Sequence, residues 1–580
     1  MIKILSRSIR QYKRDAILTP LFMVGEVAME CTLPMIMAIL IDHLYTENVS
    51  DLIRIGLILL AMAMFSLFCG IMSGRFAASA SAGFAANLRH DIFYRIQDFS
   101  FSDVDKFSTS SLITRLTTDV GNVQMSFMMI IRTAVRSPLM LIFSVIMSFR
   151  INAGVASIFL AIIPILGLGL YLIASRAFPI FRRIFKRYDA MNTSVQENVN
   201  GIRVVKSFVR EDHETKKFRK TSGQVMKDFR HVERVLALNG PLMMFCGYGA
   251  MLVISYISSR IIISSGGSQM SPGQLSSFIT YCSQILMSMM MLSMIVVMCA
   301  ISVESAKRIT EVLKTRSTLV SPKNGITEVE DGSIDFDNVS FRYSGQSGED
   351  ALDNVKLHIK SGQTVGIIGS TGSSKSTLIQ LIPRLYDTTS GTVSVGGHNV
   401  KEYDLDSLRK QIAVVLQKNV LFSGTIKENI RWGKSDATDE EIEQVCRIAQ
   451  AHDFITQLSD GYDTKIERGG TNVSGGQKQR LCIARALIAR PKVLILDDST
   501  SAVDTRTDAL LRKALKTYIP QTTKLIIAQR VASVQDADLI VVMDNGRIVE
   551  QGTHEQLVAL GGIYSEVLKS QTSGSEKKEA

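Results

Sequence analysis

The sequence predicts a polytopic α-helical membrane domain followed by a soluble α/β domain. Six apolar stretches before residue 301 are each long enough to cross a bilayer, which takes ~20 residues. From about Ile334 onward, short apolar strands alternate with helical segments that carry many polar residues. These two unlike parts explain how a chain with 21% charged residues also contains 46% hydrophobic residues.

Positively charged residues predict the orientation of the spans. Lysine and arginine are frequent in Met1–Arg14 and in the long connections Arg75–Gln124 and Arg176–Arg234, and they are rare in the short links. Because positive connections stay in the cytoplasm, both termini and both long connections are expected there. The net charge of +11 is explained in this way without nucleic acid. The six spans run over Ala16–Ile41, Leu52–Gly74, Met125–Phe149, Ala153–Ala174, Gly240–Ser264 and Leu275–Ala300.

The long connections have a helical pattern of apolar residues. This spacing is found in Leu88–Phe99 and Asp189–Phe208, so the membrane helices are expected to continue far beyond the bilayer. Each connection must then turn around, near Asp103–Ser110 and near Arg203–Arg210. These turns are the natural contacts for the soluble domain.

Three charged residues lie inside predicted spans. Glu26 and Glu30 are one helical turn apart and share a face, and Arg136 lies in the third span. Charges inside a membrane are costly and indicate function. One interpretation is an acidic wall that attracts a cationic ligand. The other is a structural role, in which these side chains face a water-filled cavity or form ion pairs between helices, for example Glu30 with Arg136. The sixth span is rich in methionine, which suits a pocket for varied apolar ligands or simple apolar filling. The candidate ligand contacts are Glu26, Glu30, Met291 and Met294.

A phosphate-binding loop lies near the beginning of the soluble part. The apolar strand Val365–Ile368 leads directly into a glycine-containing loop, and Thr377–Leu385 is predicted as the following helix. Backbone N–H groups of such a loop face phosphates. Lys375 would reach the β- and γ-phosphates, and the Ser376 hydroxyl would bind magnesium together with Asp497, which ends a later apolar strand. The loop consists of Gly369, Ser370, Thr371, Gly372, Ser373, Ser374, Lys375, Ser376 and Thr377.

The octapeptide Val473–Arg480 is similar to the signature sequence of ATP-binding cassette (ABC) transporters. It lies just before the strand that ends in Asp497, at the spacing of that family. Six spans followed by one P-loop NTPase domain resemble the half-transporter layout of ABC exporters. The resemblance implies ATP and Mg²⁺ as cofactors, with Ser376, Gln417 and Asp497 at the magnesium. It also implies nucleotide contacts for Tyr343, Gln417, Ser474, Gly475, Gly476, Gln477 and Asp504, the last in the D-loop segment Ser501–Asp504.

Three positions depart from the family pattern. Ser374 replaces the last glycine of the loop, where the backbone takes unusual angles, so some strain is expected there. Asp498 replaces the catalytic glutamate and is one methylene shorter. Gln529 replaces the switch histidine and has no titratable proton near neutral pH. An ATPase coupled to transmembrane movement is therefore expected, with a weakly active site on this chain.

The departures and the intact signature together predict a heterodimer. In this family each ATP lies between the P-loop of one chain and the signature of the other. The chain therefore resembles the degenerate-site subunit of bacterial heterodimeric multidrug exporters, which implies export of amphipathic or hydrophobic compounds across the plasma (inner) membrane. The alternatives are a homodimer that hydrolyses ATP slowly, a homodimeric exporter of lipid or peptide, and an ATP-gated channel or regulator.

The domain boundaries follow from composition. The membrane domain is predicted over residues 1–313 and a polar linker over 314–331. The nucleotide-binding domain is predicted over 332–570, and a polar, disordered tail over 571–580. Seven scattered cysteines without CxxC spacing predict neither a disulfide framework nor a zinc site.

Overall fold

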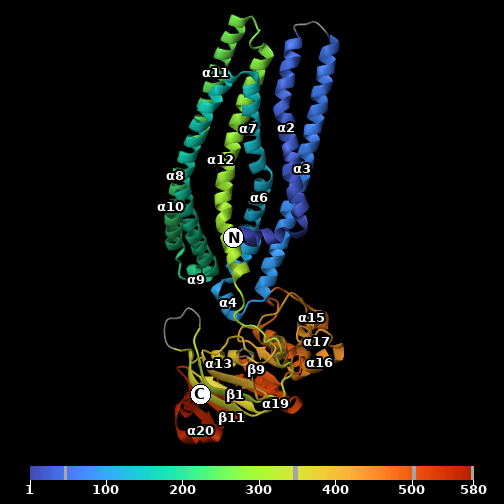
Figure 1. Cartoon of the computed structure of the whole chain (residues 1–580). Helices are drawn as coiled ribbons and strands as arrows, with labels where there is room; N and C mark the ends of the chain where they lie inside the picture. The colour runs from blue at the N-terminus through green and yellow to red at the C-terminus, as the bar shows by residue number, and fades with distance from the viewer. Residues whose placement is uncertain (45–48, 344–349, 499–503, 577–580) are drawn as a thin grey trace. The chain divides into compact units, whose positions relative to one another are not determined.

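The computed structural model describes residues 1–44, 49–343, 350–498 and 504–576 (Figure 1). The chain forms two compact units. The first contains Met1–Gln97 and Ser108–Thr315, and the second contains Asp98–Phe107 and Arg316–Ala580. The short segment Asp98–Phe107 thus belongs to the soluble unit, although the sequence places it within the membrane domain.

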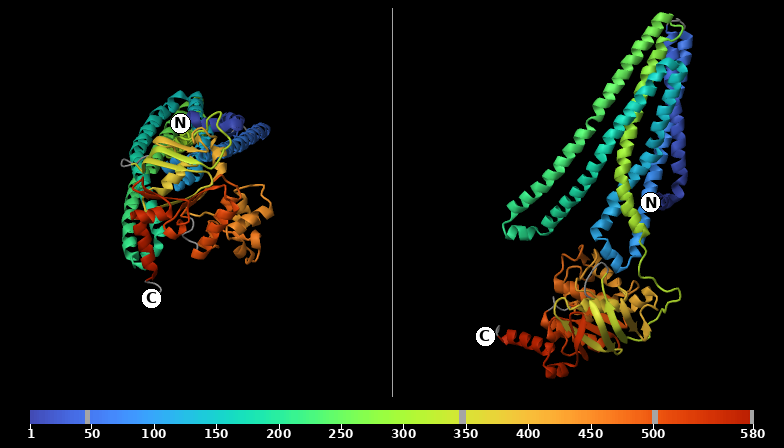
Figure 2. Two further views of the ribbon diagram at one scale, coloured as in Figure 1. Left: turned by 90° about the horizontal axis from the view of Figure 1, so that it is seen from below. Right: turned by 60° about the vertical axis from the view of Figure 1, so that its left-hand side comes forward.

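The first unit consists of long helices, and the prediction of six spans is confirmed. Among the described residues, six helices are long and apolar enough to cross a membrane. Helices α8 and α10 lie side by side, as Figure 1 and the right-hand view of Figure 2 show. The helices are α1 (Ile2–Leu5), η1 (Ser6–Tyr12), α2 (Lys13–His43), α3 (Val49–Gln97), α5 (Thr109–Thr114), the π-helical turn η2 (Arg115–Asp119), α6 (Val120–Ile131), α7 (Thr133–Ile151), α8 (Ala153–Asn200), α9 (Ile202–Ser207), α10 (Glu211–Leu236), α11 (Asn239–Ser265) and α12 (Pro272–Lys314).

Polar contacts join α12 to α2 near the middle of the membrane unit. Pro34 has no N–H, so the carbonyl of Glu30 lacks its usual donor within α2. Gln284 Nε2 of α12 donates to that carbonyl at 3.2 Å, and Ser277 Oγ donates to the Pro34 carbonyl at 2.6 Å. The Tyr281 hydroxyl donates to the Cys31 carbonyl at 2.7 Å. The bond from Gln284 thus satisfies the carbonyl that Pro34 leaves without a helical donor and that lipid could not satisfy.

The soluble unit contains two larger sheets and helices around them. The six-stranded sheet has the order β12-β11-β3-β10-β9-β6, and all of its neighbouring strands are parallel except β11 and β12. The four-stranded sheet has the order β2-β1-β4-β5 and is antiparallel. The strands are β1 (Ile334–Phe341), β2 (Leu352–Ile359), β3 (Thr364–Gly369), β4 (Ser390–Val395), β5 (His398–Asn399), β6 (Ile412–Val415), β7 (Gly424–Thr425), β8 (Lys465–Ile466), β9 (Val493–Asp497), β10 (Thr523–Ile527), β11 (Leu539–Asp544) and β12 (Arg547–Gly552).

The six-stranded sheet is buried on both faces. Val493 and Ile495 of β9 join the hydrophobic core shared with the antiparallel sheet, whereas Leu494 and Leu496 join the core formed with the helices. A continuous apolar strand is what such burial requires. The helices of this unit are α4 (Phe101–Lys106), α13 (Lys375–Leu381), α14 (Leu405–Gln411), α15 (Ile426–Arg431), α16 (Asp439–Ile448), α17 (His452–Thr456), η3 (Gly461–Asp463), α18 (Gly475–Leu487), α19 (Thr505–Tyr518), η4 (Val531–Ser533), α20 (His554–Leu560) and α21 (Ile563–Glu576).

Residues 571–576 differ from the predicted disordered tail, whose last residues, 577–580, lie outside the described residues. The sequence predicts disorder from Gln571, but α21 continues to Glu576. Gln571 holds this last turn against η4, because its Oε1 accepts from the Val531 N–H at 2.9 Å and its Nε2 donates to the Gln529 carbonyl at 2.9 Å. These bonds stabilise α21 at Gln571, within the segment predicted to be disordered.

Candidate nucleotide-binding site

The order of the strands brings the site together. Strands β3, β10 and β9 are neighbours and parallel, so their carboxyl ends lie at one edge of the sheet. The P-loop follows β3, Asp497 ends β9, and Gln529 follows β10 by two residues. Open parallel sheets bind their ligands at this edge.

The P-loop has the strand-loop-helix form that the sequence predicts. A side chain on Gly369 would clash with the carbonyl oxygen of Met543, so this position requires glycine. Ser374, which caps α13, has φ of 70° and ψ of 25°. This left-handed conformation is unfavourable for a residue with a Cβ. The departure from glycine at Ser374 thus places strain in the loop.

Lys375 is folded back onto the loop. Its ammonium group donates to the carbonyls of Gly369 at 2.9 Å and Ser370 at 2.7 Å. Burial lowers the pKa of Lys375, and the nearby Asp497 and Asp498 carboxylates oppose that shift. The third donor of Lys375 bonds Ser373 Oγ at 3.2 Å. An anionic phosphate group suits this place, because it would replace neutral acceptors with charged oxygens beside a partly desolvated cation.

Ser376 and Asp497 provide hard oxygen ligands side by side. Ser376 Oγ donates to Asp497 Oδ1 at 3.1 Å. Asp497 is buried, and this burial raises its pKa, while the bond from Ser376 opposes the shift. Hydroxyl, carboxylate and amide oxygens suit Mg²⁺. The residues that would hold the ion are Ser376, Asp497 and, from the loop after β6, Gln417.

The two departures after β9 and β10 contact one another. Gln529 Nε2 donates to Asp498 Oδ2 at 2.8 Å, and Gln417 Nε2 donates to the same oxygen at 3.4 Å. Asp498 has φ of 44°, a conformation that aspartate tolerates better than most residues. The sequence indicates Asp498, Gln529 and Gln417 separately, but it does not indicate that both glutamines donate to the same oxygen of Asp498.

Tyr343 lies beside the helix that follows the P-loop. Its hydroxyl is 3.0 Å from Thr377 Oγ1 and donates to Gln380 Oε1 at 3.3 Å. Its ring meets the Tyr386 ring edge-on, with centroids 5.3 Å apart. A flat ring beside the P-loop helix suits stacking on a base.

Tyr386 is a site neighbour that the sequence analysis missed. Its hydroxyl donates to Asp105 Oδ2 of α4 at 2.8 Å, and its ring lies 6.1 Å from that of Phe101. Thr318 Oγ1 also lies 3.0 Å from Ser100 Oγ, the helix cap of α4. The sequence feature that could have indicated Tyr386 is an aromatic residue soon after the P-loop helix.

The signature forms the start of α18. Ser474 caps this helix, since its Oγ accepts from the Gln477 N–H at 3.3 Å while Gln477 Oε1 accepts from the Ser474 N–H at 2.9 Å. Gly475 and Gly476 occupy the first turn. Among the residues that the structure describes, no hydrogen bond joins this segment to the chain's own P-loop.

Asp504 has a structural role at the start of α19. Its carboxylate accepts from the Thr507 N–H at 2.9 Å and from Thr507 Oγ1 at 2.7 Å. The backbone bond from Thr507 lowers the pKa of Asp504. The rest of the predicted D-loop, residues 501–503, lies outside the described residues.

Arg136 is paired with Glu30, which is one of the arrangements that the sequence leaves open. Arg136 Nη2 lies 2.8 Å from both carboxylate oxygens of Glu30 and 3.7 Å from Glu26 Oε1. Ser144 Oγ donates to Gln284 Oε1 at 2.9 Å nearby. The predicted ligand contacts Met291 and Met294 of α12 are 39% and 50% exposed.

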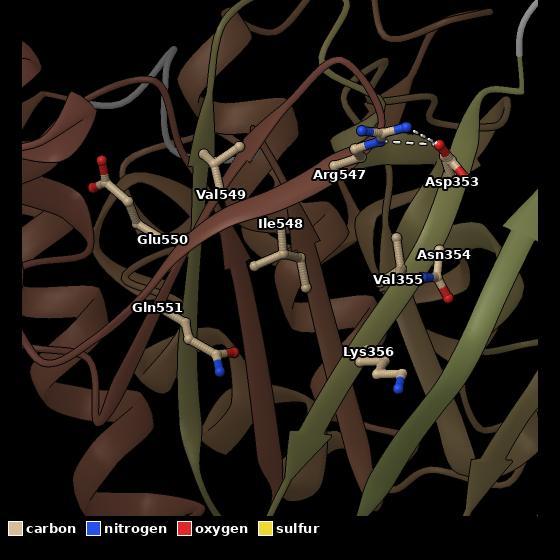
Figure 3. A pocket seen from close by; sticks show the side chains of 9 residues that line it. All are labelled: Asp353, Asn354, Val355, Lys356, Arg547, Ile548, Val549, Glu550 and Gln551. Atoms are coloured by element: carbon tan, nitrogen blue, oxygen red, sulfur yellow. Dashed lines mark hydrogen bonds and ion pairs between the residues drawn. The ribbon is translucent and has the colours of Figure 1, made fainter.

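A cavity of about 520 Å³ lies elsewhere in the soluble unit, between the edge strands β2 and β12 (Figure 3). Arg547 pairs with Asp353 at one end of it, where Nε donates at 2.9 Å. None of the predicted site residues lines this cavity. The nucleotide site is therefore assigned from its chemistry and not from cavity size.

Comparisons with known families agree with this geometry. The family model "ABC transporter transmembrane region" matches residues 17–289, and the family model "ABC transporter" matches residues 352–501. The ABC transporter ATP-binding protein YfiB of Bacillus subtilis is 37% identical over 571 residues, which cover 98% of each chain.

Two further similarities are informative. The ATP-dependent lipid A-core flippase of Syntrophus aciditrophicus is 30% identical, over 90% of this chain and 86% of the relative. The solved structure of a bacterial Atm1-family ABC exporter with ATP bound superimposes with a TM-score of 0.83 at 22% identity, over 97% of this chain and 98% of that chain. The fold is therefore that of an ABC exporter.

Proposed function

Since this chain belongs to the ABC transporter family and is a multi-pass membrane ATPase coupled to transport, we propose that it exports amphipathic compounds as one half of a heterodimer. In this proposal it lies in the plasma membrane with both termini in the cytoplasm. Its own P-loop binds MgATP but turns it over slowly, and the second chain supplies the P-loop at which most ATP is hydrolysed.

The hydrogen bonds on Asp498 carry the proposal of a weak site. Hydrolysis needs a carboxylate that orients or deprotonates water. Asp498 Oδ2 already accepts from Gln529 and Gln417, and an oxygen of this kind has two lone pairs. A side chain shorter than glutamate also retreats by ~1 Å, which can lower a rate on the order of 10²-fold. Both effects reduce catalysis while Lys375, Ser376 and Asp497 still support binding.

The intact signature supports the heterodimer. A homodimer would contain two copies of the Asp498–Gln529 pair and no strong site. The well-formed cap of α18 by Ser474 and Gln477 instead suits completion of a partner's site. We therefore infer that the partner carries glutamate and histidine at the corresponding positions.

Two features of the membrane unit support the proposed substrate class. Ser144 contacts Gln284, and Ser126 Oγ donates to the Met298 carbonyl at 3.4 Å. Arg136, which pairs with Glu30, and Met291 of α12 fall between these two contacts along their helices, so an ion pair and exposed thioethers lie at a similar depth. This combination suits a compound with a polar head and an apolar body. A lipid is the second candidate, because one relative is named a lipid A-core flippase.

The experiment compares acid replacements in the two chains. The neighbouring reading frame is expected to encode the partner, and the two chains are purified together in proteoliposomes. Asp498→Asn should leave most of the ATPase turnover and dye transport, whereas replacing the partner's glutamate should remove at least ~90% of both. An equally complete loss of ATPase turnover in the two variants would contradict the proposal that the partner's site hydrolyses most of the ATP. Absence of uptake against a gradient by the wild-type pair would contradict export.

A further inference from the structure

We propose that Gln571 of the last helix, α21, is a positioning residue that keeps ATP turnover slow at this chain's own nucleotide site. It acts through the backbone of Gln529 and thereby holds the Gln529 side chain on Asp498. The inference rests on the proposed weak site and names the element that maintains it.

Gln571 bridges the backbone on both sides of Arg530. Its Nε2 donates to the Gln529 carbonyl at 2.9 Å, and its Oε1 accepts from the Val531 N–H at 2.9 Å. The two ends of one amide group are thus used together, which fixes its orientation. Strand β10 ends at Ile527, so Gln529 lies beyond the strand pairing and is positioned by contacts of this kind.

Helix α21 is a firm anchor for this contact. Tyr564 in its first turn is fully buried, and the Tyr564 hydroxyl lies 2.7 Å from Nδ1 of His554 in α20. Val567 and Leu568 pack against the hydrophobic core of the soluble unit. Gln571 follows these two residues by four and three positions, so it shares their face of the helix. The core therefore fixes the helix face from which Gln571 reaches the backbone.

The contact extends from α21 to the carboxylate that would orient water. Gln529 Nε2 donates to Asp498 Oδ2 at 2.8 Å, while Gln571 holds the carbonyl of the same Gln529. Because this backbone is already fixed, the Gln529 side chain loses less conformational freedom when it bonds the carboxylate. The bond occupies a lone pair that activation of water requires. Gln571 thus favours the state in which Asp498 is blocked.

The contact is not required for η4 to fold. Val531 and Val534 are buried in the hydrophobic core. Ser533 Oγ donates to Asp508 Oδ2 of α19 at 3.2 Å, and both of these residues are buried as well. These contacts hold η4 without α21. The specific effect of Gln571 is therefore on the carbonyl of Gln529.

Gln571→Met removes both hydrogen bonds and keeps the length of the side chain. The full chain is reconstituted at high density in proteoliposomes, so that every site formed between two copies contains Asp498 and Gln529. Single-turnover hydrolysis of radiolabelled MgATP should become about threefold faster or more, with an unchanged Kd for MgATP. A merely structural role of Gln571 predicts slower hydrolysis or weaker binding instead.

Thr572→Val is the matched control on the same helix. Thr572 is exposed, and its Oγ1 donates to the Leu568 carbonyl within α21 at 2.9 Å. This variant should change neither the rate nor the Kd. If Gln571→Met does not fold, a chain that ends at Ser570 takes its place, since it lacks both hydrogen bonds and introduces no new side chain.

Gln529→Ala separates this inference from the proposed function. It should raise the rate at least as much as Gln571→Met, and the double variant should be no faster than Gln529→Ala, because Gln571 acts through Gln529. A faster rate in Gln529→Ala but not in Gln571→Met would overturn the inference alone, as would a further increase in the double variant. No increase in Gln529→Ala would contradict the proposed cause of the weak site.

Discussion

Asp498 and Gln529 form one hydrogen-bonded unit, so their effects on catalysis should be coupled. We predict that Asp498→Glu/Gln529→His raises ATPase at this site by about tenfold or more. Asp498→Glu alone should give clearly less, because Gln529 would still donate to the carboxylate. The measurement uses the purified pair with the partner's catalytic glutamate replaced, so that only this site contributes. Equal gains from the single and double variants would show that the two residues act independently.

The left-handed backbone of Ser374 leads to a prediction about stability. Ser374→Gly removes the steric cost of φ of 70°, which exceeds the entropy that glycine loses on folding. We expect the free energy of unfolding of the soluble unit to rise by roughly 0.5–1 kcal/mol. Thermal unfolding of the full chain with and without MgATP measures it. A control, Ser373→Gly, lies at a position without positive φ and should not stabilise the protein.

Burial of Asp497 predicts a pH dependence. Its pKa is raised in the folded protein, and its protonated form cannot bind Mg²⁺. MgATP affinity should therefore fall as the pH drops, starting at a higher pH than for an ordinary aspartate with a pKa of ~3.9. Fluorescence of a trinitrophenyl ATP analogue between pH 8 and pH 5 measures this. Binding without magnesium should depend less on pH.

The raised pKa of Asp497 also affects folding stability, and this effect of pH is opposite to its effect on MgATP affinity. A carboxyl group with a raised folded-state pKa stabilises the fold below its unfolded pKa, and this contribution is lost as the pH rises through the folded pKa. At neutral pH the ionised Asp497 thus destabilises the nucleotide-free protein. Asp497→Asn should raise the melting temperature without nucleotide and abolish the increase on adding MgATP. A lower melting temperature at pH 7 would contradict this account.

At the scale of elements, α4 is held to the soluble unit through Tyr386. Burial and the bond to Asp105 raise the pKa of Tyr386, so its hydroxyl remains a donor at physiological pH. The chain joins α4 directly to α3 and α5 of the membrane unit. We therefore predict that movement of α4 with the soluble unit is passed to the membrane helices along the backbone.

Tyr386→Phe should weaken this attachment by about 1 kcal/mol, because it removes one hydrogen bond to a solvent-accessible carboxylate. We expect fewer dye molecules transported per ATP hydrolysed, while ATP binding is retained. Asp105→Asn keeps an acceptor oxygen and should have a smaller effect. Parallel measurement of dye transport and phosphate release in proteoliposomes gives the ratio, and an unchanged ratio in Tyr386→Phe would argue against this coupling.

At the scale of the whole molecule, the chain should be incomplete without its partner. Purified alone, it should bind MgATP but show turnover at least ~10-fold below that of the complex, because every composite site then contains Asp498 and Gln529. Size-exclusion chromatography with ATPase assays checks both statements. A homodimer as active as the complex would favour the slow homodimeric alternative.

The sequence by itself determined the six spans and the strand-loop-helix of the P-loop, and it predicted strain at Ser374, whose left-handed conformation the structure shows. These features depend on local length, hydropathy and loop chemistry, which a linear pattern contains. The ABC resemblance likewise depends on short motifs such as Val473–Arg480 at fixed spacing.

Only the tertiary structure decided which side chains that are distant in the sequence contact one another. The contact of Gln529 with Asp498 depends on β10 lying beside β9, and the pairing of Arg136 with Glu30 depends on α7 packing on α2. The bond from Tyr386 to Asp105 joins residues 281 positions apart. The hydrogen bond of Gln571 depends on η4 lying beside α21. Such contacts follow from strand order and helix packing, because hydrogen bonds act over ångströms in space and not along the chain.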